Sequence, residues 1–292
     1  MRAARTNEVY SVQLPASDTH WDLAGLAAGA QTPINSAEFL FSSDVVAEGR
    51  GRVVGEVTMP ASGGTFGWLG PAIDMVLGRS YVTVLPVGNT CLTLGMRLDS
   101  IGAAFLPGER VRIHGSVLGV DGPYSLTSAT VISESGRVIG TGTGRFLSIP
   151  SAARARELPD LRPFSDRGVE LAEALGTQVT ERHDDGLTVR FDYSPPLANP
   201  HGVLHGGVQI AMFETAVARH HNLFNSAGGT ALLADLTISF LSPVVAEEHN
   251  GVSIRTRTFR SGRRIALTRA EIVGADGHVC SSVTATFNIS HS

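Results

Sequence analysis

The sequence Asn-Pro-His-Gly-Val-Leu-His-Gly-Gly spans residues Asn199–Gly207 and decides how the chain around it must fold. Its last two glycines open an apolar run, Val208 to Val217, which is typical of a buried helix. A helix that begins at Gly206 directs unpaired backbone N–H groups and the positive end of its dipole toward whatever lies in front of it. The run also contains one carboxylate, Glu214. Backbone donors beside a carboxylate favour acyl-transfer chemistry, because the donors can hold a developing oxyanion.

A weaker copy of this pattern lies 140 residues earlier in the chain. The aligned pairs include Pro60 with Pro200, Gly67 with Gly207, Asp74 with Glu214, Leu98 with Ile238 and Gly122 with Gly262. After a slip of one residue the matches continue with Val111 and Val252, then Phe146 and Phe287. A repeat of this length is that of a whole domain, so the sequence predicts a duplication.

The chain of 292 residues is long enough for two domains. We predict an N-terminal domain over residues 1–152, a linker over 153–165 and a C-terminal domain over 166–292. The predicted linker is charged and rich in proline, which favours an exposed segment. The fold class is α+β, because one apolar helix and a long antiparallel sheet in each half are best buried when the sheet wraps around the helix.

The expected elements follow the same order in both halves. In the first half we expect a helix over 23–30, strands over 38–46 and 51–58, and the apolar helix over 67–79. In the second half we expect helices over 168–175 and 206–221, with strands over 178–182, 187–193, 232–241, 252–258, 265–273 and 279–289. Alternating apolar and polar residues in the last four strands indicate a sheet with one covered face.

Composition excludes several classes of protein. The formal net charge is −4 and no block of Lys and Arg occurs, which argues against a nucleic-acid partner. The two cysteines, Cys91 and Cys280, match no metal-ligand spacing and suit a reducing compartment. The sequence lacks an apolar stretch of the roughly 18–20 residues that a membrane span needs, and a secretory signal. We therefore expect a cytoplasmic protein with no membrane partner.

The second half resembles the hotdog-fold acyl-CoA thioesterases of the phenylacetyl-CoA thioesterase (PaaI-like) type. The family motif is His-Gly-Gly with an acidic residue nine positions after the His and often Asn or Gln six positions before it. This chain has His205-Gly206-Gly207, Glu214 and Asn199 at those positions, and Thr237–Pro243 resembles the strand after the helix. The first half shares the resemblance only through the internal repeat, so the implied architecture is a tandem, or double, hotdog whose first loop is degenerate.

The resemblance implies a hydrolase that cleaves acyl-CoA thioesters. The Gly206 N–H and the Asn199 side-chain amide would hold the thioester carbonyl oxygen, and His205 would shape the loop or bind near the thioester. A helix carboxylate would either attack the carbonyl carbon or activate a water. The resemblance implies no metal and no cofactor apart from the coenzyme A of the substrate. The two halves would pair as an internal pseudo-dimer, and further homo-oligomers stay open.

In this family the carboxylate of one unit works with the loop of the other, which predicts two unequal sites here. One combines Asp74 with Asn199, His205 and Gly206, whereas the other combines Glu214 with Met59, Thr65 and Phe66. Met59 has no amide donor, and Phe66 adds bulk where a thioester must approach the backbone. We predict one complete site, which uses Asp74. The alternative is that Asp74 is a remnant of the duplication, stabilised locally near its helix start.

Further candidate residues surround this motif. We expect His201 and Gly207 to line the substrate pocket; no third ligand is spaced to make a metal site with His201 and His205. Arg255, Arg257 and Arg263 could bind the phosphates of coenzyme A, or they could form a solvated strand face. His220-His221 are expected to complement the dipole at the end of the helix.

Two other functions fit parts of the sequence. Asn199-Pro200-His201 is similar to the Asn-Pro-x-His of double-hotdog enoyl-CoA hydratases, but the Asp/His pair that those enzymes need is not evident. The degenerate first loop would suit a non-catalytic acyl-CoA-binding protein, although no DNA-binding segment accompanies it. Hydration of an enoyl-CoA, or tight binding without turnover, would identify these alternatives.

Overall fold

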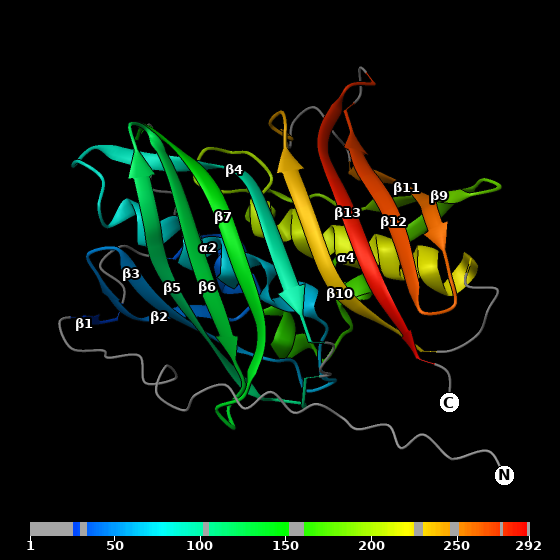
Figure 1. The fold of residues 1–292 in the computed structure, drawn as a ribbon, viewed down its shortest axis with the longest axis horizontal. Coiled ribbons are helices and arrows are strands. Elements are labelled where there is room, and N and C mark those ends of the chain that lie inside the picture. Colours follow the sequence, from blue (N-terminus) through cyan, green and yellow to red (C-terminus); the bar gives the residue numbers. More distant parts are fainter. Residues whose placement is uncertain are drawn as a thin grey trace, which may run out of the picture.

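A computed structural model describes residues 26–29, 34–101, 105–151, 161–224, 230–245, 251–274 and 277–290. Within these ranges the chain forms one 13-stranded antiparallel sheet with two long helices on one side of it (Figure 1). The helices are α1 (Ser36–Leu40), α2 (Gly70–Val82), α3 (Leu171–Ala174) and α4 (Gly206–Phe224), with the 3-10 turns η1 (Phe66–Leu69), η2 (Phe164–Arg167) and η3 (Pro195–Leu197).

The strands divide between the two halves of the sequence. The first half contributes β1 (Ala27–Ala28), β2 (Ser43–Gly49), β3 (Arg52–Thr58), β4 (Asn89–Ser100), β5 (Arg110–Asp121), β6 (Tyr124–Ile132) and β7 (Val138–Pro150). The second half contributes β8 (Gln178–Arg182), β9 (Gly186–Phe191), β10 (Thr230–Phe240), β11 (Val252–Ser261), β12 (Ile265–Val273) and β13 (Val279–Ser290). The strand order is β1-β2-β3-β5-β6-β7-β4-β10-β13-β12-β11-β9-β8, so the two halves are arranged symmetrically about the central β4–β10 pair.

Several β-bulges of the sheet recur at equivalent positions in the two halves of the chain. Three β-bulges of the first half have counterparts 140 or 141 residues later in the second. The paired bulge positions are Leu94 and Ala234, Leu118 and Phe259, and Ile139 and Cys280. A bulge bends a strand and is kept as a designed feature of a fold. Their agreement in position supports the duplication inferred from the sequence.

The two long helices meet at their N-termini behind the centre of the sheet. A Cβ built on Gly70 would lie 2.4 Å from the Gly207 carbonyl oxygen, and one built on Gly207 would lie 2.3 Å from the Pro71 Cα. Both helices can therefore approach this closely only because glycine stands at the crossing. The crossing brings the start of α4 close to Asp74 of α2, and the turn before α2 close to Glu214 of α4.

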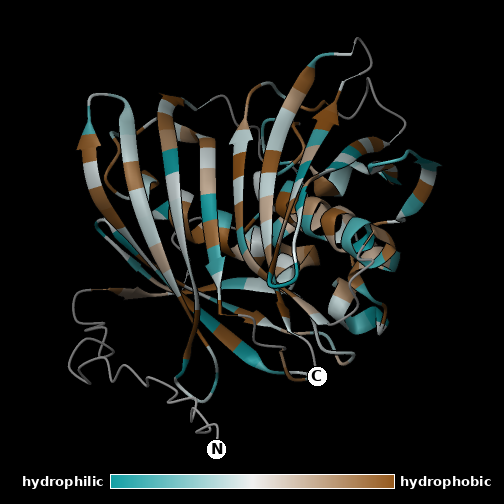
Figure 2. Cartoon of the chain, turned by 45° about the vertical axis from the view of Figure 1, so that its right-hand side comes forward, coloured by the Kyte–Doolittle hydropathy of each residue, from teal (hydrophilic) through white to brown (hydrophobic). Residues whose placement is uncertain are grey.

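Each helix is buried by its own half of the sheet. In α2, Ile73 and Leu77 are fully buried, and in α4 the same is true of Phe213 and Val217. The strands alternate as the sequence predicts: β6 has the burial pattern of every second residue turned toward the core. Figure 2 shows this alternation as bands of apolar and polar residues along the strands.

Most predicted elements are present, but the beginning of the chain differs. Of the helix expected over 23–30, only residues 26–29 lie in the described ranges, and Ala27–Ala28 form a strand. The strand expected over 38–46 is wrong in its first part, because α1 occupies Ser36–Leu40. Asn35 caps this helix in a reciprocal capping box with Glu38, which overrides the strand pattern.

The predicted linker is only partly exposed. Residues 152–160 lie outside the described part of the chain, but residues 163–165 belong to the folded body. Phe164 is buried, and its ring meets that of Phe41 edge-on at 5.3 Å between centroids. The end of the predicted linker is therefore packed against the first half. None of the described helices is both long and apolar enough to cross a membrane.

Candidate active site

Two carboxylates cross over between the halves at the meeting point of the long helices. Asp74 of α2 accepts a 2.9 Å hydrogen bond from the Gly207 N–H at the start of α4. Glu214 of α4 accepts a 2.7 Å hydrogen bond from the Gly67 N–H in η1, just before α2. Each carboxylate thus lies at the positive end of the partner helix, an arrangement that stabilises an anion. The two groups have the same backbone environment but different side-chain surroundings.

Asp74 is held from two sides in the first of these sites. Its Oδ1 accepts a 3.0 Å hydrogen bond from the Thr93 hydroxyl of β4, and Gly207 binds Oδ2. Burial raises the pKa of the Asp74 carboxyl above its ordinary value, while His205, Thr93 and Gly207 partly oppose this. A Cβ at Gly206 would lie 2.7 Å from Asp74 Oδ2, so the motif needs glycine there. Thr93 was not predicted, because a lone threonine in a strand carries no spacing signal.

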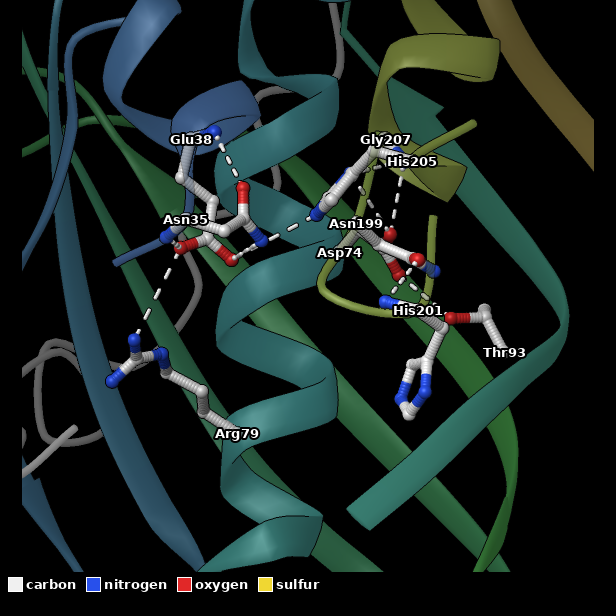
Figure 3. Close-up of polar contacts among 9 residues, drawn as sticks. All are labelled: Asn35, Glu38, Asp74, Arg79, Thr93, Asn199, His201, His205 and Gly207. Atoms are coloured by element: carbon white, nitrogen blue, oxygen red, sulfur yellow. Dashed lines mark hydrogen bonds and ion pairs between the residues drawn. The ribbon is translucent and has the colours of Figure 1, made fainter. Parts of the chain in front are cut away.

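His205 lies between Asp74 and an acid from the start of the chain (Figure 3). Its Nδ1 accepts a 3.0 Å hydrogen bond from the Gly207 N–H and lies 3.5 Å from Asp74 Oδ2. Its Nε2 lies 3.7 Å from Glu38 Oε1. In the neutral ring these contacts place the proton on Nε2, toward Glu38. Burial lowers the pKa of His205, but Glu38 and Asp74 outweigh it, so the pKa is raised overall.

Glu38 is a site residue that the sequence analysis missed. It is 5% exposed and belongs to α1, which the capping box with Asn35 holds in place. Its carboxylate also lies 4.0 Å from Arg79, and Arg79 lies 3.6 Å from Glu48. The Asn-Ser-Ala-Glu spacing is itself a helix-start signal and could have identified α1. No sequence pattern indicates that this helix reaches His205 in the other half.

The loop before α4 contains the two donors, Asn199 and Gly206, for which the sequence predicts an oxyanion role. Asn199 Oδ1 accepts hydrogen bonds from the backbone N–H groups of His201, at 2.9 Å, and Val203, at 3.2 Å. These bonds fix the Asn199 amide so that its Nδ2 remains a donor. Within the described part of the chain, the Gly206 N–H has no hydrogen-bond partner. The loop therefore offers one side-chain donor and one backbone donor beside Asp74.

These groups line a cavity of about 690 Å³ between the two halves. Asp74, Asn199, His201, His205 and Gly206 all contribute to its wall. This volume suits a small organic ligand. The structure thus brings together the residues that the sequence paired as the complete site, whereas Gly207 serves Asp74 through its N–H and does not line the cavity.

The second site has Glu214 at its centre. The Thr65 hydroxyl and the Gly67 N–H both donate to Glu214 Oε2, and the Phe66 N–H is a further donor. Burial nevertheless raises the pKa of the Glu214 carboxyl above its ordinary value. Met59 is 1% exposed and supplies no donor. A separate cavity of about 590 Å³, lined in part by Thr65, Phe66 and Glu214, lies here.

The arginines proposed for coenzyme A do not reach either cavity. Arg255, Arg257 and Arg263 are exposed on β11 and its hairpin and are absent from both cavity walls. Arg257 instead forms a 2.8 Å ion pair with Asp185. Because β11 turns these side chains away from the core, their placement favours the alternative of a solvated strand face. The described residues also contain no cluster of three His, Cys, Asp or Glu side chains able to bind a metal ion.

The prediction of a cationic cap is wrong for His220, whereas His221 lies in the last turn of helix α4, which ends at Phe224. His220 donates to or accepts from the hydroxyls of Thr256 and Thr258, at 2.9 Å and 2.8 Å, and burial lowers its pKa to about 4. Burial also lowers the pKa of His221, whose ring stacks on Phe287. The His220 ring is therefore a neutral packing group at neutral pH, and the His221 ring packs against Phe287.

Comparison with known proteins identifies the fold. Residues 194–288 match the family model described as the acyl-CoA thioesterase N-terminal domain. A Haemophilus influenzae protein described as an esterase is 26% identical over 106 residues, which cover 36% of this chain and 75% of that protein. The family match contains the loop before α4 and the helix itself, and it leaves the first half unassigned.

Solved structures extend the likeness to both halves. An acyl-CoA thioesterase II, TesB2, from Mycobacterium marinum has a TM-score of 0.60 and 14% identity, covering 82% of this chain and 93% of its own. A tesB protein from Mycobacterium avium subspecies paratuberculosis has a TM-score of 0.63 and 12% identity, covering 85% and 96%. A hotdog-fold protein from Alicyclobacillus acidocaldarius has a TM-score of 0.59 and 14% identity, covering 89% and 100%. The fold is thus that of the hotdog proteins, while the PaaI-like subtype stays a prediction.

Proposed function

We propose that this hotdog-fold thioesterase hydrolyses acyl-CoA at one complete site, which Asp74 of the first half forms with the Asn199–Gly207 loop of the second. The observation that supports this most strongly is the pairing of a buried carboxylate with an unengaged N–H at Gly206. Thioester hydrolysis needs both a base or nucleophile and donors for the oxyanion. The family match of residues 194–288 agrees with this activity.

In the proposed reaction the thioester carbonyl oxygen accepts hydrogen bonds from the Gly206 N–H and the Asn199 Nδ2. These donors strengthen as negative charge develops on that oxygen in the tetrahedral intermediate. Each donor of this kind is worth about 3–4 kcal/mol in the transition state. The N-terminus of α4 adds the favourable end of its dipole.

We propose that Asp74 acts as a general base. A water attacks the carbonyl carbon while its proton moves to the Asp74 carboxylate, and collapse of the intermediate breaks the C–S bond. The departing thiolate takes up the proton, so the products are a free acid and coenzyme A. Thr93 and Gly207 fix one lone pair on each carboxylate oxygen and leave the others for water. His205 would orient the loop through Gly207 rather than touch the thioester.

Such a site requires that the two halves of the chain pair with each other. The segments 1–152 and 166–292 would be tandem hotdog units that pair as an internal pseudo-dimer. The mirrored strand order and the repeated bulges support this division. The reaction needs no metal or redox group, and coenzyme A enters only as part of the substrate. The cytoplasmic location and the assembly of further copies stay predictions.

A thiol-release assay tests the function directly. The full chain is incubated with short-chain, long-chain and aryl CoA esters, and free coenzyme A is detected with a thiol reagent. We expect release of thiol that is stoichiometric with free acid. In the same series, crotonyl-CoA tests for a hydratase: a hydrated CoA ester without free thiol would contradict the proposal. Tight binding of every ester without turnover would contradict it in favour of a binding protein.

A single-turnover reaction in ¹⁸O-labelled water tests the role of Asp74. A general base predicts that the first product acid carries one labelled oxygen. A nucleophilic Asp74 would form a mixed anhydride, and hydrolysis at the aspartyl carbon would leave the label in the protein. Label found in Asp74 by peptide mass spectrometry would therefore overturn the general-base assignment but not the site.

A further inference from the structure

The two cavities are built on the same helical positions of the duplicated chain. Five residues of α2 line the first cavity, and the five residues 140 positions later on α4 line the second. The pairs are Asp74 and Glu214, Met75 and Thr215, Gly78 and Ala218, Arg79 and Arg219, and Val82 and Asn222. An arginine thus follows the carboxylate at the same distance along each helix.

The two arginines have different electrostatic surroundings. Arg79 has a carboxylate on each side, at 4.0 Å to Glu38 and 3.6 Å to Glu48. Arg219 has a buried Nε without a hydrogen-bond partner, and no described carboxylate forms an ion pair with its guanidinium. Glu38 is the third residue of α1, and the third residue of α3 is Glu173. Glu173 is exposed and does not line the second cavity.

Arg219 lines the second cavity, and no described carboxylate pairs with its guanidinium, which points to an acceptor that enters from the cavity. Arg219 could bind such an acceptor with a planar pair of N–H groups, the geometry that carboxylates match. Two other acids line the cavity. Glu170 is exposed at its rim, and Glu214 is already bound by Thr65 and Gly67. Neither acid neutralises Arg219.

The rest of the wall is largely apolar. Trp68, Leu232, Leu233 and Phe287 line the cavity together with Leu171 of α3. At the position of the Thr93 hydroxyl, which binds Asp74 in the first cavity, the second has Leu233. This cavity therefore has no counterpart of Thr93 or of Asn199, and among the described residues Arg219 has no acidic partner beside the apolar side chains.

We propose that the second cavity binds an apolar carboxylic acid without cleaving a thioester, with the carboxylate on Arg219 and the apolar body against Leu233 and Phe287. The most direct source of such a ligand is the acid that thioester hydrolysis releases, and this part of the inference rests on the proposed function. An unrelated carboxylic acid has the same chemistry. The two sources are distinguished by comparing the acid of the best substrate with other acids of equal length.

The test measures binding directly, by isothermal titration of the full-length Asp74→Asn protein, in which turnover cannot interfere. Octanoate is the probe, and octanamide is a neutral control of the same shape. We expect octanoate to bind at least tenfold more tightly than octanamide. In Arg219→Gln the affinity for octanoate should fall at least tenfold, while the affinity for octanamide stays the same. Arg219→Lys should keep part of the affinity for octanoate.

A second variant keeps the test valid if Arg219→Gln is unstable. Ala218→Phe fills the cavity next to Arg219 without changing any charge and should abolish binding of both probes. Thermal unfolding checks that each variant folds. Equal affinity of the parent and Arg219→Gln for octanoate, or unchanged binding in Ala218→Phe, would overturn the inference.

The outcomes also separate this inference from the proposed function. If the chain releases no thiol from any CoA ester but binds octanoate through Arg219, only the proposed function fails. If thiol release depends on Asp74 but octanoate binding is independent of Arg219, only the second-cavity inference fails.

Discussion

The two helix carboxylates occupy equivalent positions in a duplicated chain, yet their surroundings differ in the way that the proposed function requires of a reactive group and a packed one. Asp74 has a glycine loop, a buried histidine and a threonine hydroxyl around it. Glu214 has a loop in which Thr65 and Phe66 replace the His-Gly pair, and three donors converge on it. A carboxylate with all its donors supplied by the protein is well placed to hold two helices together. Under the proposed function, the donors beside Asp74, and not its position in the fold, make it the catalytic acid.

Gene duplication explains how such a difference can persist. In the proposed function, one site requires the carboxylate of one half and the loop of the other. The second carboxylate and the first loop would then be released from catalysis and would need only to preserve the helix crossing. Thr65 and Gly67 satisfy that need by binding Glu214.

The largest expected effect comes from matched substitution of the two acids. Asp74→Asn keeps the shape of the side chain but removes the base, and kcat/KM for thiol release should fall about 10²–10⁴-fold. Glu214→Gln should change kcat/KM less than threefold on the same substrate, within the scatter of mutations remote from a reaction. Steady-state kinetics of both purified variants provides the measurement. A loss of activity confined to Glu214→Gln would reverse the assignment of the two sites.

The next comparison concerns the two glycine turns. A Cβ at Gly206 would lie 2.7 Å from Asp74 Oδ2, and one at Gly67 would lie 2.4 Å from Glu214 Oε2. Gly206→Ala should lower kcat/KM about 100-fold because it displaces an oxyanion donor. Gly67→Ala should lower the free energy of unfolding by about 1–3 kcal/mol, as overpacking does, with little effect on the rate per folded enzyme. Kinetics and chemical denaturation of both variants should show these opposite results; a rate loss in Gly67→Ala alone would contradict the comparison.

The sequence was sufficient for the regular part of this fold. Apolar periodicity predicts both buried helices, and the spacing of 140 residues relates Asp74 to Glu214 in the sequence alone. Because side chains on a strand alternate, the strand limits were close to those observed for the second half. The pairing of Asp74 with the loop at Asn199 came from the family resemblance and was not evident from local patterns.

The remaining site residues could not be predicted because they approach through tertiary structure. Glu38 belongs to a short helix that a strand-like pattern concealed, and its contact with His205 joins positions far apart in the chain. Thr93 stands on a strand whose bulge at Leu94 is invisible in the sequence. His220, near the end of α4, was misassigned, since burial lowers its pKa to about 4 and leaves no charge for the dipole.

A smaller effect is expected from Glu38, which has no counterpart near Thr65 in the second site. Glu38→Gln removes the anion that faces His205 Nε2, so the pKa of His205 should fall. We expect kcat/KM to decrease about tenfold, equivalent to about 1.4 kcal/mol, because the loop donors lose orientation. The pH dependence of the His205 ring proton signals, measured by NMR, distinguishes this positioning role from simple loss of stability. An unchanged titration of His205 would contradict it.

The pH dependence of stability should report the burial of Glu214. Burial raises the pKa of Glu214 in the folded protein, so this group stabilises the fold below its ordinary pKa, and that stabilisation is lost as pH rises through the folded value. Glu214→Gln cannot titrate, so its stability relative to the parent should increase between pH 5 and pH 8. Urea unfolding at both pH values measures the difference. If the stability of Glu214→Gln relative to the parent decreased toward pH 8, the hydrogen-bond donors around Glu214 would lower its pKa more than burial raises it.

The smallest and most demanding effect is a gain of function at the second site. In the Asp74→Asn background, Met59→Asn, Thr65→His and Phe66→Gly together would copy the loop of the second half onto the first. The new amide and the exposed backbone should raise thiol release about three- to tenfold, well below the value of an evolved donor, because the copied loop is not held in position. Adding Glu214→Gln to this triple change should return the rate to background. If the rate rose without Glu214, the new activity would come from somewhere other than the second carboxylate, and the loops alone would not explain why the two halves differ.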